Sequence, residues 1–170
     1  MKKVLVLGRP GSGKTTFADA LGKKLNLPVY HLDAFYWNEY WQEKPHQEYL
    51  NTSYALADKK EWIIEGNATK TLNYRLQKAD AIFYLDFPLW LCFKQAIKRQ
   101  WYYYGKDLPD MPKGCTSYFD FHFLCFLYRN VWGFTKKKQH IENELRNATH
   151  IPVYRFKSHA ESKSFINTLK

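Results

Sequence analysis

The residues Gly8-Arg9-Pro10-Gly11-Ser12-Gly13-Lys14-Thr15 decide the fold, because they match the pattern G-x-x-x-x-G-K-[ST] in full. The apolar run before them, Lys3–Leu7, has the composition of a buried strand. Apolar residues then recur every fourth position from Phe17 to Leu25, which predicts a helix over Lys14–Leu25. The quoted stretch is therefore expected to form the turn between a buried strand and an amphipathic helix.

The chemistry of this turn suits the binding of phosphate groups. Its glycines let the backbone curl so that several N–H groups converge on phosphate oxygens, and the helix N-terminus adds partial positive charge. Lys14 is expected to reach the β- and γ-phosphates, and the Thr15 hydroxyl to coordinate Mg²⁺. We predict that ATP or a similar nucleoside triphosphate binds to Gly8, Arg9, Pro10, Gly11, Ser12, Gly13, Lys14, Thr15 and Thr16.

Strand and helix patterns alternate along the rest of the chain. Further strands are expected at Val29–Leu32, Trp62–Ile64, Ala81–Leu85 and Ile151–Phe156. Further helices are expected at Pro45–Lys59, around Leu72 and Leu76, from Leu89 to Trp101, from Phe119 to Arg146 with a break near Gly133, and from a capping box at Ser158 and Glu161 onward. This alternation predicts an α/β fold, a parallel sheet with helices on both faces.

Length and composition favour one globular domain over residues 1–170, with a lid or insert at about 102–117. Three cysteines without metal-binding or disulfide-framework spacing suit reduced thiols. The N-terminal apolar run ends at Gly8, short of the roughly 7–15 residues of a secretory signal core. No stretch approaches the roughly 20 apolar residues of a membrane span, so a cytoplasmic protein is expected.

The net charge of +10 is concentrated in the second half of the chain. Residues 94–157 hold 12 Lys or Arg and 5 Asp or Glu, which gives +7 for that segment. Such a surface attracts anions, whether phosphates, nucleotides or nucleic acid, and does not choose among them. The chain also has 13 Tyr, 12 Phe and 6 Trp, which could stack on bases or fill a core and a lid.

Other motifs narrow the class of protein. The Asn-Lys-x-Asp motif of GTPases and the Leu-Ser-Gly-Gly motif of transporters are both missing, which leaves the small kinases. Beyond the phosphate loop, distinctive residues occur at His31–Trp37, Trp62–Asn67, Arg75-Leu76, Ala79-Asp80, Leu85–Pro88 and Pro109–Met111. On these residues the sequence resembles the adenylate-kinase-like P-loop kinases and, within them, the FlaR-like "DNA topology modulation" proteins. The resemblance implies a five-stranded sheet in the order 2-3-1-4-5, a flexible lid and kinase chemistry.

Carboxylates follow three of the expected strands, where an open parallel sheet binds its ligands. We interpret Asp33 as the carboxylate that orients an acceptor hydroxyl or accepts its proton, with a helix-capping role as the alternative. The resemblance implies that Glu65 acts on Mg²⁺ through water. Asn67 is expected to contact substrate or to form a turn. Asp86 is interpreted as a strand end and helix cap, and His31 as structural.

Phosphoryl transfer needs positive charge where the γ-phosphate moves. The candidates are Arg75, Lys98, Arg99 and Arg129, with a solvated basic helix face as the alternative for each. The resemblance places arginines on the helix that leads into the lid, where Lys98 and Arg99 stand. We interpret Lys136–Lys138 as a solvated run.

The predicted enzyme is a phosphotransferase that moves the γ-phosphate of Mg·ATP to a nucleoside monophosphate, a nucleoside or a small alcohol. The predicted catalytic residues are Lys14, Asp33, Arg99 and Arg129, the substrate-binding residues Asp33, Asn67 and Arg75, and the metal ligands Thr15 and Glu65. A nucleotide-dependent regulator that binds DNA through the basic 94–157 face, and a nucleotide-binding protein with only slow hydrolysis, are the alternatives.

Overall fold

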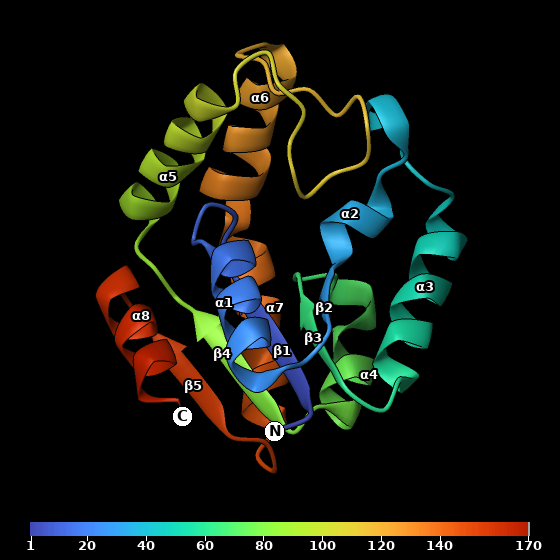
Figure 1. The fold of residues 1–170 in the computed structure, drawn as a ribbon, viewed down its shortest axis with the longest axis vertical. Coiled ribbons are helices and arrows are strands. Elements are labelled where there is room, and N and C mark those ends of the chain that lie inside the picture. The colour runs from blue at the N-terminus through green and yellow to red at the C-terminus, as the bar shows by residue number, and fades with distance from the viewer. Residues whose placement is uncertain (170) are drawn as a thin grey trace.

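A computed structural model describes residues 1–169 of the chain. Five strands form one sheet, and every neighbouring pair runs parallel. Their order is β2-β3-β1-β4-β5 (Figure 1), which confirms the predicted class and strand order. The strands are β1 (Lys3–Gly8), β2 (Val29–His31), β3 (Trp62–Glu65), β4 (Ala81–Leu85) and β5 (Val153–Phe156).

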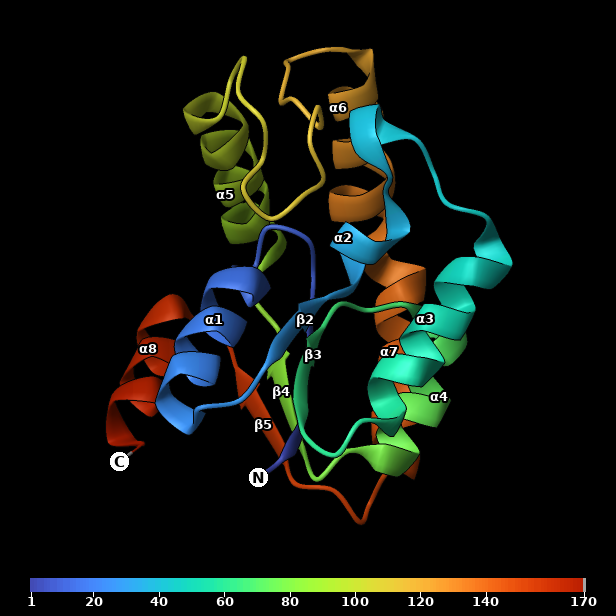
Figure 2. The same cartoon turned by 45° about the vertical axis from the view of Figure 1, so that its right-hand side comes forward.

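Helices lie on both faces of the sheet, with α1 and α8 on one face and α3, α4 and α7 on the other (Figures 1 and 2). The helices are α1 (Lys14–Leu25), α2 (Leu32–Tyr36), α3 (His46–Asp58), α4 (Thr69–Lys78), α5 (Leu89–Tyr102), α6 (Phe121–Phe126), α7 (Thr135–Asn147) and α8 (His159–Thr168). Three shorter helical segments are η1 (Glu39–Trp41), η2 (Leu127–Val131) and η3 (Trp132–Phe134). Within residues 1–169, no helix has the length and apolar content needed to cross a membrane.

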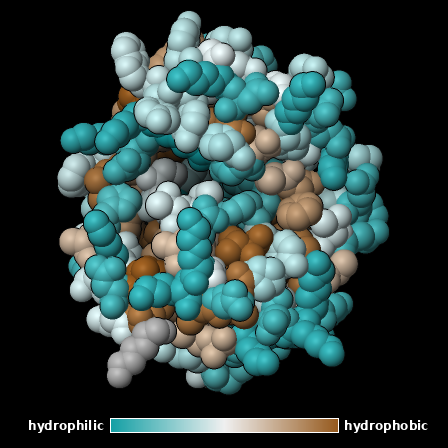
Figure 3. Space-filling view, viewed as in Figure 1, coloured by the Kyte–Doolittle hydropathy of each residue, from teal (hydrophilic) through white to brown (hydrophobic). Residues whose placement is uncertain are grey.

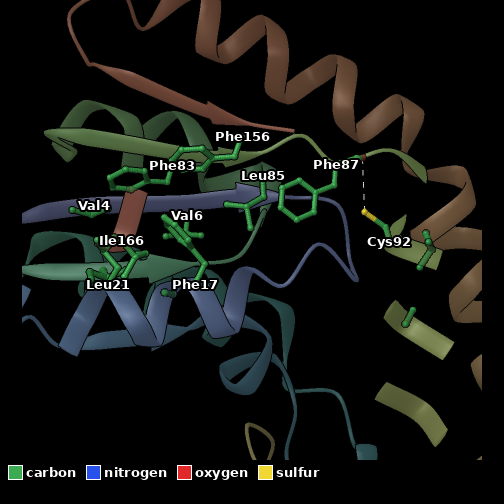
Figure 4. Close-up of a cluster of buried hydrophobic side chains, with 14 of the residues drawn as sticks. Val4, Val6, Phe17, Leu21, Phe83, Leu85, Phe87, Cys92, Phe156 and Ile166 are labelled. Carbon is green, nitrogen blue, oxygen red and sulfur yellow. Dashed lines mark hydrogen bonds between the residues drawn. The ribbon is translucent and has the colours of Figure 1, made fainter. Parts of the chain in front are cut away.

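The central strands divide the core into two halves, because successive side chains of a strand point to opposite faces. Val4 and Val6 of β1 pack with Phe17 of α1 on one face (Figure 4), where the Phe17 ring lies 5.4 Å from that of Phe83. Leu5 and Leu7 face the other way, into the core beneath α3, α4 and α7. Burial on both faces explains the continuous apolar runs of β1 and β4, as in other parallel sheets.

The segment from 119 to 147 differs from the single long helix that the sequence predicts. The α-helical pattern is interrupted by a π-helix at η2 and a 3₁₀ turn at η3, so the break begins before Gly133. The wider turn buries Leu127 and Val131, while Arg129 and Asn130 line a cavity. π-Helical turns often mark functional sites.

Candidate active site at the carboxyl edge of the sheet

A cavity of about 1620 Å³ opens at the carboxyl ends of β1, β2 and β3. The space-filling view shows a hollow where Figure 1 places the loop before α1 (Figure 3). Residues of that loop line one part of the cavity, and residues of α2, α3 and the 103–120 loop line another. A typical pocket for one small ligand has about 300–1,000 Å³, so this cavity has room for two ligands.

The loop from Gly8 to Thr15 has the backbone of a phosphate cradle. Gly11 and Gly13 have φ values of 81° and 80°, a left-handed conformation that glycine adopts without strain. Ser12 N–H donates to the Arg9 carbonyl at 3.0 Å, which closes the turn. Gly13 begins α1 without any side-chain cap, so the first N–H groups of the helix face the loop without a side-chain acceptor.

Gly11→Ala tests this cradle, because a Cβ at Gly11 would lie 2.2 Å from the Cys92 carbonyl oxygen. We expect at least about a tenfold weaker affinity for an ATP analogue, since a left-handed non-glycine residue alone costs about 1–2 kcal/mol. Calorimetric titration measures the affinity. Gly105→Ala is the matched control, because Gly105 is also left-handed at φ 71° but has no atom within 4 Å of its added Cβ. Wild-type affinity in Gly11→Ala would contradict the assignment.

Glu65 stands at the centre of a chain of charged groups beside the loop. Its carboxylate lies 3.5 Å from the Lys14 ammonium, 3.5 Å from the Thr15 hydroxyl and 3.2 Å from His31 Nδ1. His31 Nε2 in turn lies 3.1 Å from the Asp19 carboxylate. Burial by itself would raise the pKa of Glu65, but Lys14 and His31 outweigh it and lower the pKa. Glu65 therefore stays ionised although its side chain is only 4% exposed.

His31 has a more specific place than the structural role that its strand position suggests. Its hydrogen bond to Glu65 raises its pKa against the opposing effect of burial, with further contributions from the charges of Glu65 and Asp19. The imidazole thus fixes the Glu65 carboxylate beside Thr15. Asp19 was missed by the sequence analysis, although it follows Thr15 by four residues and so shares a face of α1 with it.

Thr15 and Glu65 together suit Mg²⁺, which needs only one or two protein ligands when phosphate oxygens and waters complete its shell. Over residues 1–169, no group of three or more His, Cys, Asp or Glu side chains is arranged to hold a metal by itself. A metal ion held here would therefore depend on a bound phosphate for its coordination.

Asp33 lies in the first turn of α2, two residues beyond the end of β2, and lines the cavity. The Asp33 side chain is exposed within the cavity. Partial desolvation there raises the pKa of Asp33, the charge of Glu65 raises it further, and Lys14 opposes the rise. His31 rather than Asp33 occupies the cap position of α2, and the Asp33 carboxylate has no hydrogen-bond partner in the described chain. Its carboxylate is thus available to a ligand.

The structure corrects the expectation that Arg75 binds substrate. Arg75 is fully buried under the turn after β3 and does not line the cavity. Its guanidinium donates to the carbonyls of Gly66 at 2.9 Å, Asn67 at 2.7 Å and Ala68 at 3.1 Å. Burial lowers the pKa of Arg75 to about 10. The side chain therefore shapes the turn and is buried away from the cavity in which an acceptor would bind.

Asn67 lines the cavity, but its amide is engaged by the phosphate loop. Its oxygen accepts from Gly8 N–H at 3.2 Å and its nitrogen donates to the Gly8 carbonyl at 2.9 Å. These two bonds tie the end of β3 to the start of the loop. The arrangement makes Asn67 a structural clamp at the border between the two parts of the cavity.

Arg75→Met should lower the free energy of unfolding by about 3 kcal/mol, because it leaves buried carbonyls without their charged donor. Urea unfolding followed by circular dichroism measures the change. Lys78→Met is the control on the same helix, since its ion pair with Asp58 lies at the surface and should leave stability unchanged. Equal unfolding midpoints for Arg75→Met and the wild type would show that the turn does not depend on Arg75.

Basic side chains from three further elements reach the cavity. Lys98 and Arg99 of α5 and Arg129 of η2 line it, as does Lys137 of α7. Arg99 Nη2 lies 2.5 Å from the Asp110 carboxylate, which ties α5 to the 103–120 loop. Arg99 and Arg129, both predicted to be catalytic, thus line the same cavity, while the pairing of Arg99 with Asp110 was not predicted from the sequence.

The run Lys136–Lys138 is not simply solvated, and Asp86 does not cap α5. Lys138 pairs with Asp86 at 2.5 Å, and Arg155 of β5 pairs with the same carboxylate at 3.0 Å. Pro88 begins α5 without a side-chain cap. Asp86 therefore links α7 to the edge of the sheet, outside the cavity.

The loop at 103–120 lies across the cavity from α2 (Figure 2). Within it, the Asp107 carboxylate accepts from Gly114 N–H at 2.8 Å and from the Thr116 hydroxyl at 2.7 Å. The loop is also hydrogen-bonded to η1, since Trp41 Nε1 donates to the Thr116 carbonyl at 3.0 Å. The loop thus bridges the cavity from α5 to the segment after α2.

The strand order and the phosphate loop give this chain the P-loop NTPase fold that small kinases share. The sequence profile of the family described as "ATPase family associated with various cellular activities (AAA)" matches residues 4–64. No curated protein matches the chain in sequence.

Similar solved structures cover nearly the whole chain. Shikimate kinase from Acinetobacter baumannii in complex with shikimate has a TM-score of 0.60 at 12% identity, covering 100% of this chain and 96% of that one. Shikimate kinase from Bacteroides thetaiotaomicron has a TM-score of 0.55 at 16% identity, with 98% and 94% covered. A gluconokinase from Sinorhizobium meliloti has 0.54 at 11% identity, with 98% and 87% covered. At these identities the likeness concerns the fold.

Proposed function

We propose that this chain is a phosphotransferase that moves the γ-phosphate of Mg·ATP to the hydroxyl group of a small acceptor. The observation that carries the proposal is a single cavity that joins the phosphate loop to Asp33, a carboxylate without a protein partner. A nucleotide-hydrolysing protein without an acceptor has no need of this second compartment. The kinase folds of the similar structures and the resemblance to adenylate-kinase-like proteins support the same class.

In the proposed reaction the residues from Gly8 to Thr16 bind the triphosphate, and Lys14 turns from Glu65 toward the β- and γ-phosphates. Thr15 directly and Glu65 through water would hold Mg²⁺, which neutralises phosphate charge when bound. The acceptor hydroxyl oxygen attacks the γ-phosphorus, and Asp33 takes its proton. The bond from the γ-phosphorus to the bridging oxygen breaks, and that oxygen leaves on ADP.

Positive charge for the moving phosphoryl group would come from Arg99 and Arg129, with Lys98 beside them. Residues 102–117 act as a lid that excludes water from the cavity during transfer. Asn67 holds the phosphate loop in register with the acceptor compartment.

The experiment is ADP release from Mg·ATP in the presence of nucleoside monophosphates, nucleosides, sugars and amino alcohols. Acceptor-stimulated release, with a phosphorylated product seen by mass spectrometry, would support the proposal. ATP binding without stimulation by any acceptor would reject the phosphotransferase in favour of a nucleotide-binding protein with slow hydrolysis.

DNA binding is a second candidate, favoured by one observation. Trp101, Tyr102, Phe121 and Tyr128 are each at least 70% exposed, and they lie within the basic segment 94–157. Exposed aromatic rings near basic residues can stack on the bases of single strands. The test is retention of labelled DNA at about 50 mM and about 200 mM salt, since phosphate contacts lose affinity steeply over that range. Weak binding that does not depend on salt would reject this candidate.

A further inference from the structure

Aromatic side chains form a continuous wall at the acceptor end of the cavity. Ring centroids lie 5.3 Å apart for Trp41 and Trp37, 4.9 Å for Trp37 and Tyr36, and 5.2 Å for Tyr36 and Tyr49, each pair meeting edge to face. All four residues line the cavity. The face of each aromatic ring carries partial negative charge, which attracts cations.

The turn that carries this wall is fixed by its own hydrogen bonds and by the 103–120 loop. Asn38 N–H donates to the Gln42 carbonyl at 2.7 Å, and Lys44 N–H donates to the Tyr36 carbonyl at 3.0 Å. Trp41 is further held by its indole bond to Thr116. The wall is thus preorganised, so a ligand that binds to it need not order the turn.

The charges at this end of the cavity are negative. Asp33, Glu43 and Asp110 line it, and only Asp110 has a basic partner, Arg99. Lys44, next to Glu43 in sequence, pairs instead with Glu48 at 3.6 Å. In the described part of the chain, neither Asp33 nor Glu43 has a basic group within 4.0 Å.

Interaction with the Glu43 carboxylate raises the pKa of the Tyr36 hydroxyl to about 12, so this hydroxyl stays protonated beside Glu43. The basic groups of the cavity come from other elements, namely the phosphate loop, α5, η2 and α7. Arg99 is paired with Asp110, so Asp33 and Glu43 are the carboxylates of this group that lack a basic partner within 4.0 Å in the described part of the chain.

On the basis of the proposed phosphotransferase function, we infer that the acceptor is a small amino alcohol with a positively charged nitrogen. The ammonium group lies against the rings of Trp37 and Trp41 beside the Glu43 carboxylate, and the hydroxyl faces Asp33. A phosphate or carboxylate on the acceptor would be repelled by Asp33 and Glu43, neither of which has a basic group within 4.0 Å in the described part of the chain. Of the acceptor classes considered from the sequence, this inference disfavours nucleoside monophosphates.

The test compares binding of choline with that of 3,3-dimethyl-1-butanol, which has the same shape without the charge. Calorimetric titrations are made on the full chain loaded with a non-hydrolysable ATP analogue. Ethanolamine and glucosamine, against ethylene glycol and glucose, extend the comparison to primary amines and to a ring. We expect at least one cationic probe to bind at least about tenfold more tightly than its neutral partner. Equal or weaker binding of every cationic probe would overturn the inference.

Glu43→Gln should lower that cationic preference without abolishing it, because the amide keeps the size of the side chain and removes its charge while the aromatic rings remain. Affinity for the ATP analogue should be unchanged. Glu39→Gln is the control in the same turn, since Glu39 is exposed outside the cavity and should keep the full preference. A preference that is undiminished in Glu43→Gln would overturn the assigned position of the ammonium group.

The two proposals fail in different ways. If neutral or anionic acceptors stimulate ADP release more than cationic ones do, the phosphotransferase stands and the inferred acceptor class is wrong. If no acceptor stimulates release while choline still binds more tightly than its neutral isostere, the transfer reaction is rejected and the cation-binding wall stands.

Discussion

Lys14→Ala is expected to lower acceptor-stimulated ADP release by about 10²–10³-fold, the usual effect of removing one preorganised donor from a charged transition state. Lys14 stands at the start of α1, and its ammonium already lies close to the loop backbone, 3.5 Å from the Arg9 carbonyl. Without it, charge that develops between the β- and γ-phosphates has no side-chain partner there. Single-turnover ADP release at saturating ATP measures the loss.

The control for Lys14→Ala must deal with Glu65, because the substitution removes a partner of a buried carboxylate. A loss of activity through unfolding would then resemble a loss of catalysis. The double variant Lys14→Met, Glu65→Gln removes both charges at similar volume and should stay folded, as judged by circular dichroism, while remaining inactive. Lys23→Ala, near the end of the same helix, should behave as the wild type. A folded Lys14 variant with wild-type turnover would remove the loop from the active site.

The phosphate loop and the sheet could be predicted from the sequence because the forces that form them are local. Gly11 and Gly13 are needed wherever the backbone takes left-handed φ values, and a buried parallel strand needs an unbroken apolar run. Such signals can be found within ten residues of chain. The strand order followed from the resemblance to a known class of kinases.

Side chains that act across long sequence separations could not be placed in this way. Arg75 was expected to bind substrate because a flexible guanidinium near the sheet edge suits an anion, yet three backbone carbonyls of the turn after β3 hold it below the cavity. Whether Arg75 binds substrate or stabilises the turn depends on the conformation of that turn, which the sequence does not reveal. Glu43 likewise has no local signal, since its place in the cavity depends on the turn that follows α2.

The interruption between α6 and α7 is a backbone feature that the local sequence likewise could not locate. Helix periodicity continues through residues 119–146, and Gly133 is the only local indication of a break. The π-helix instead begins at Leu127, where packing of Leu127 and Val131 on the core and the presence of Arg129 at the cavity favour a wider turn. That preference comes from tertiary contacts.

Asp33→Asn is expected to lower acceptor-stimulated turnover by about 10²–10⁴-fold, the range for loss of a general base, and also to stabilise the protein. The pKa of Asp33 is raised in the folded state, mainly by desolvation in the cavity and further by the negative charge of Glu65. Ionisation therefore costs folding free energy once the pH exceeds its unfolded value of about 3.9, and the cost is complete above the raised folded pKa. The gain from Asp33→Asn should be absent in acid and should grow as the pH rises through that window.

Asp86→Asn provides the matched opposite case, because Lys138 and Arg155 lower the pKa of Asp86 against the effect of its partial burial. Its contribution to stability is present above the unfolded pKa and is lost as the pH falls through the lower folded pKa. We therefore expect Asp86→Asn to lower the melting temperature at pH 7 with turnover retained, and Asp33→Asn to raise it with turnover lost. Melting curves and ADP release across pH measure both. A group needed for catalysis often lowers the stability of the fold, which is why loss of turnover and a gain in stability are expected together for Asp33→Asn. A destabilised Asp33→Asn with normal turnover would instead make Asp33 a structural residue and would leave the proposed reaction without its general base.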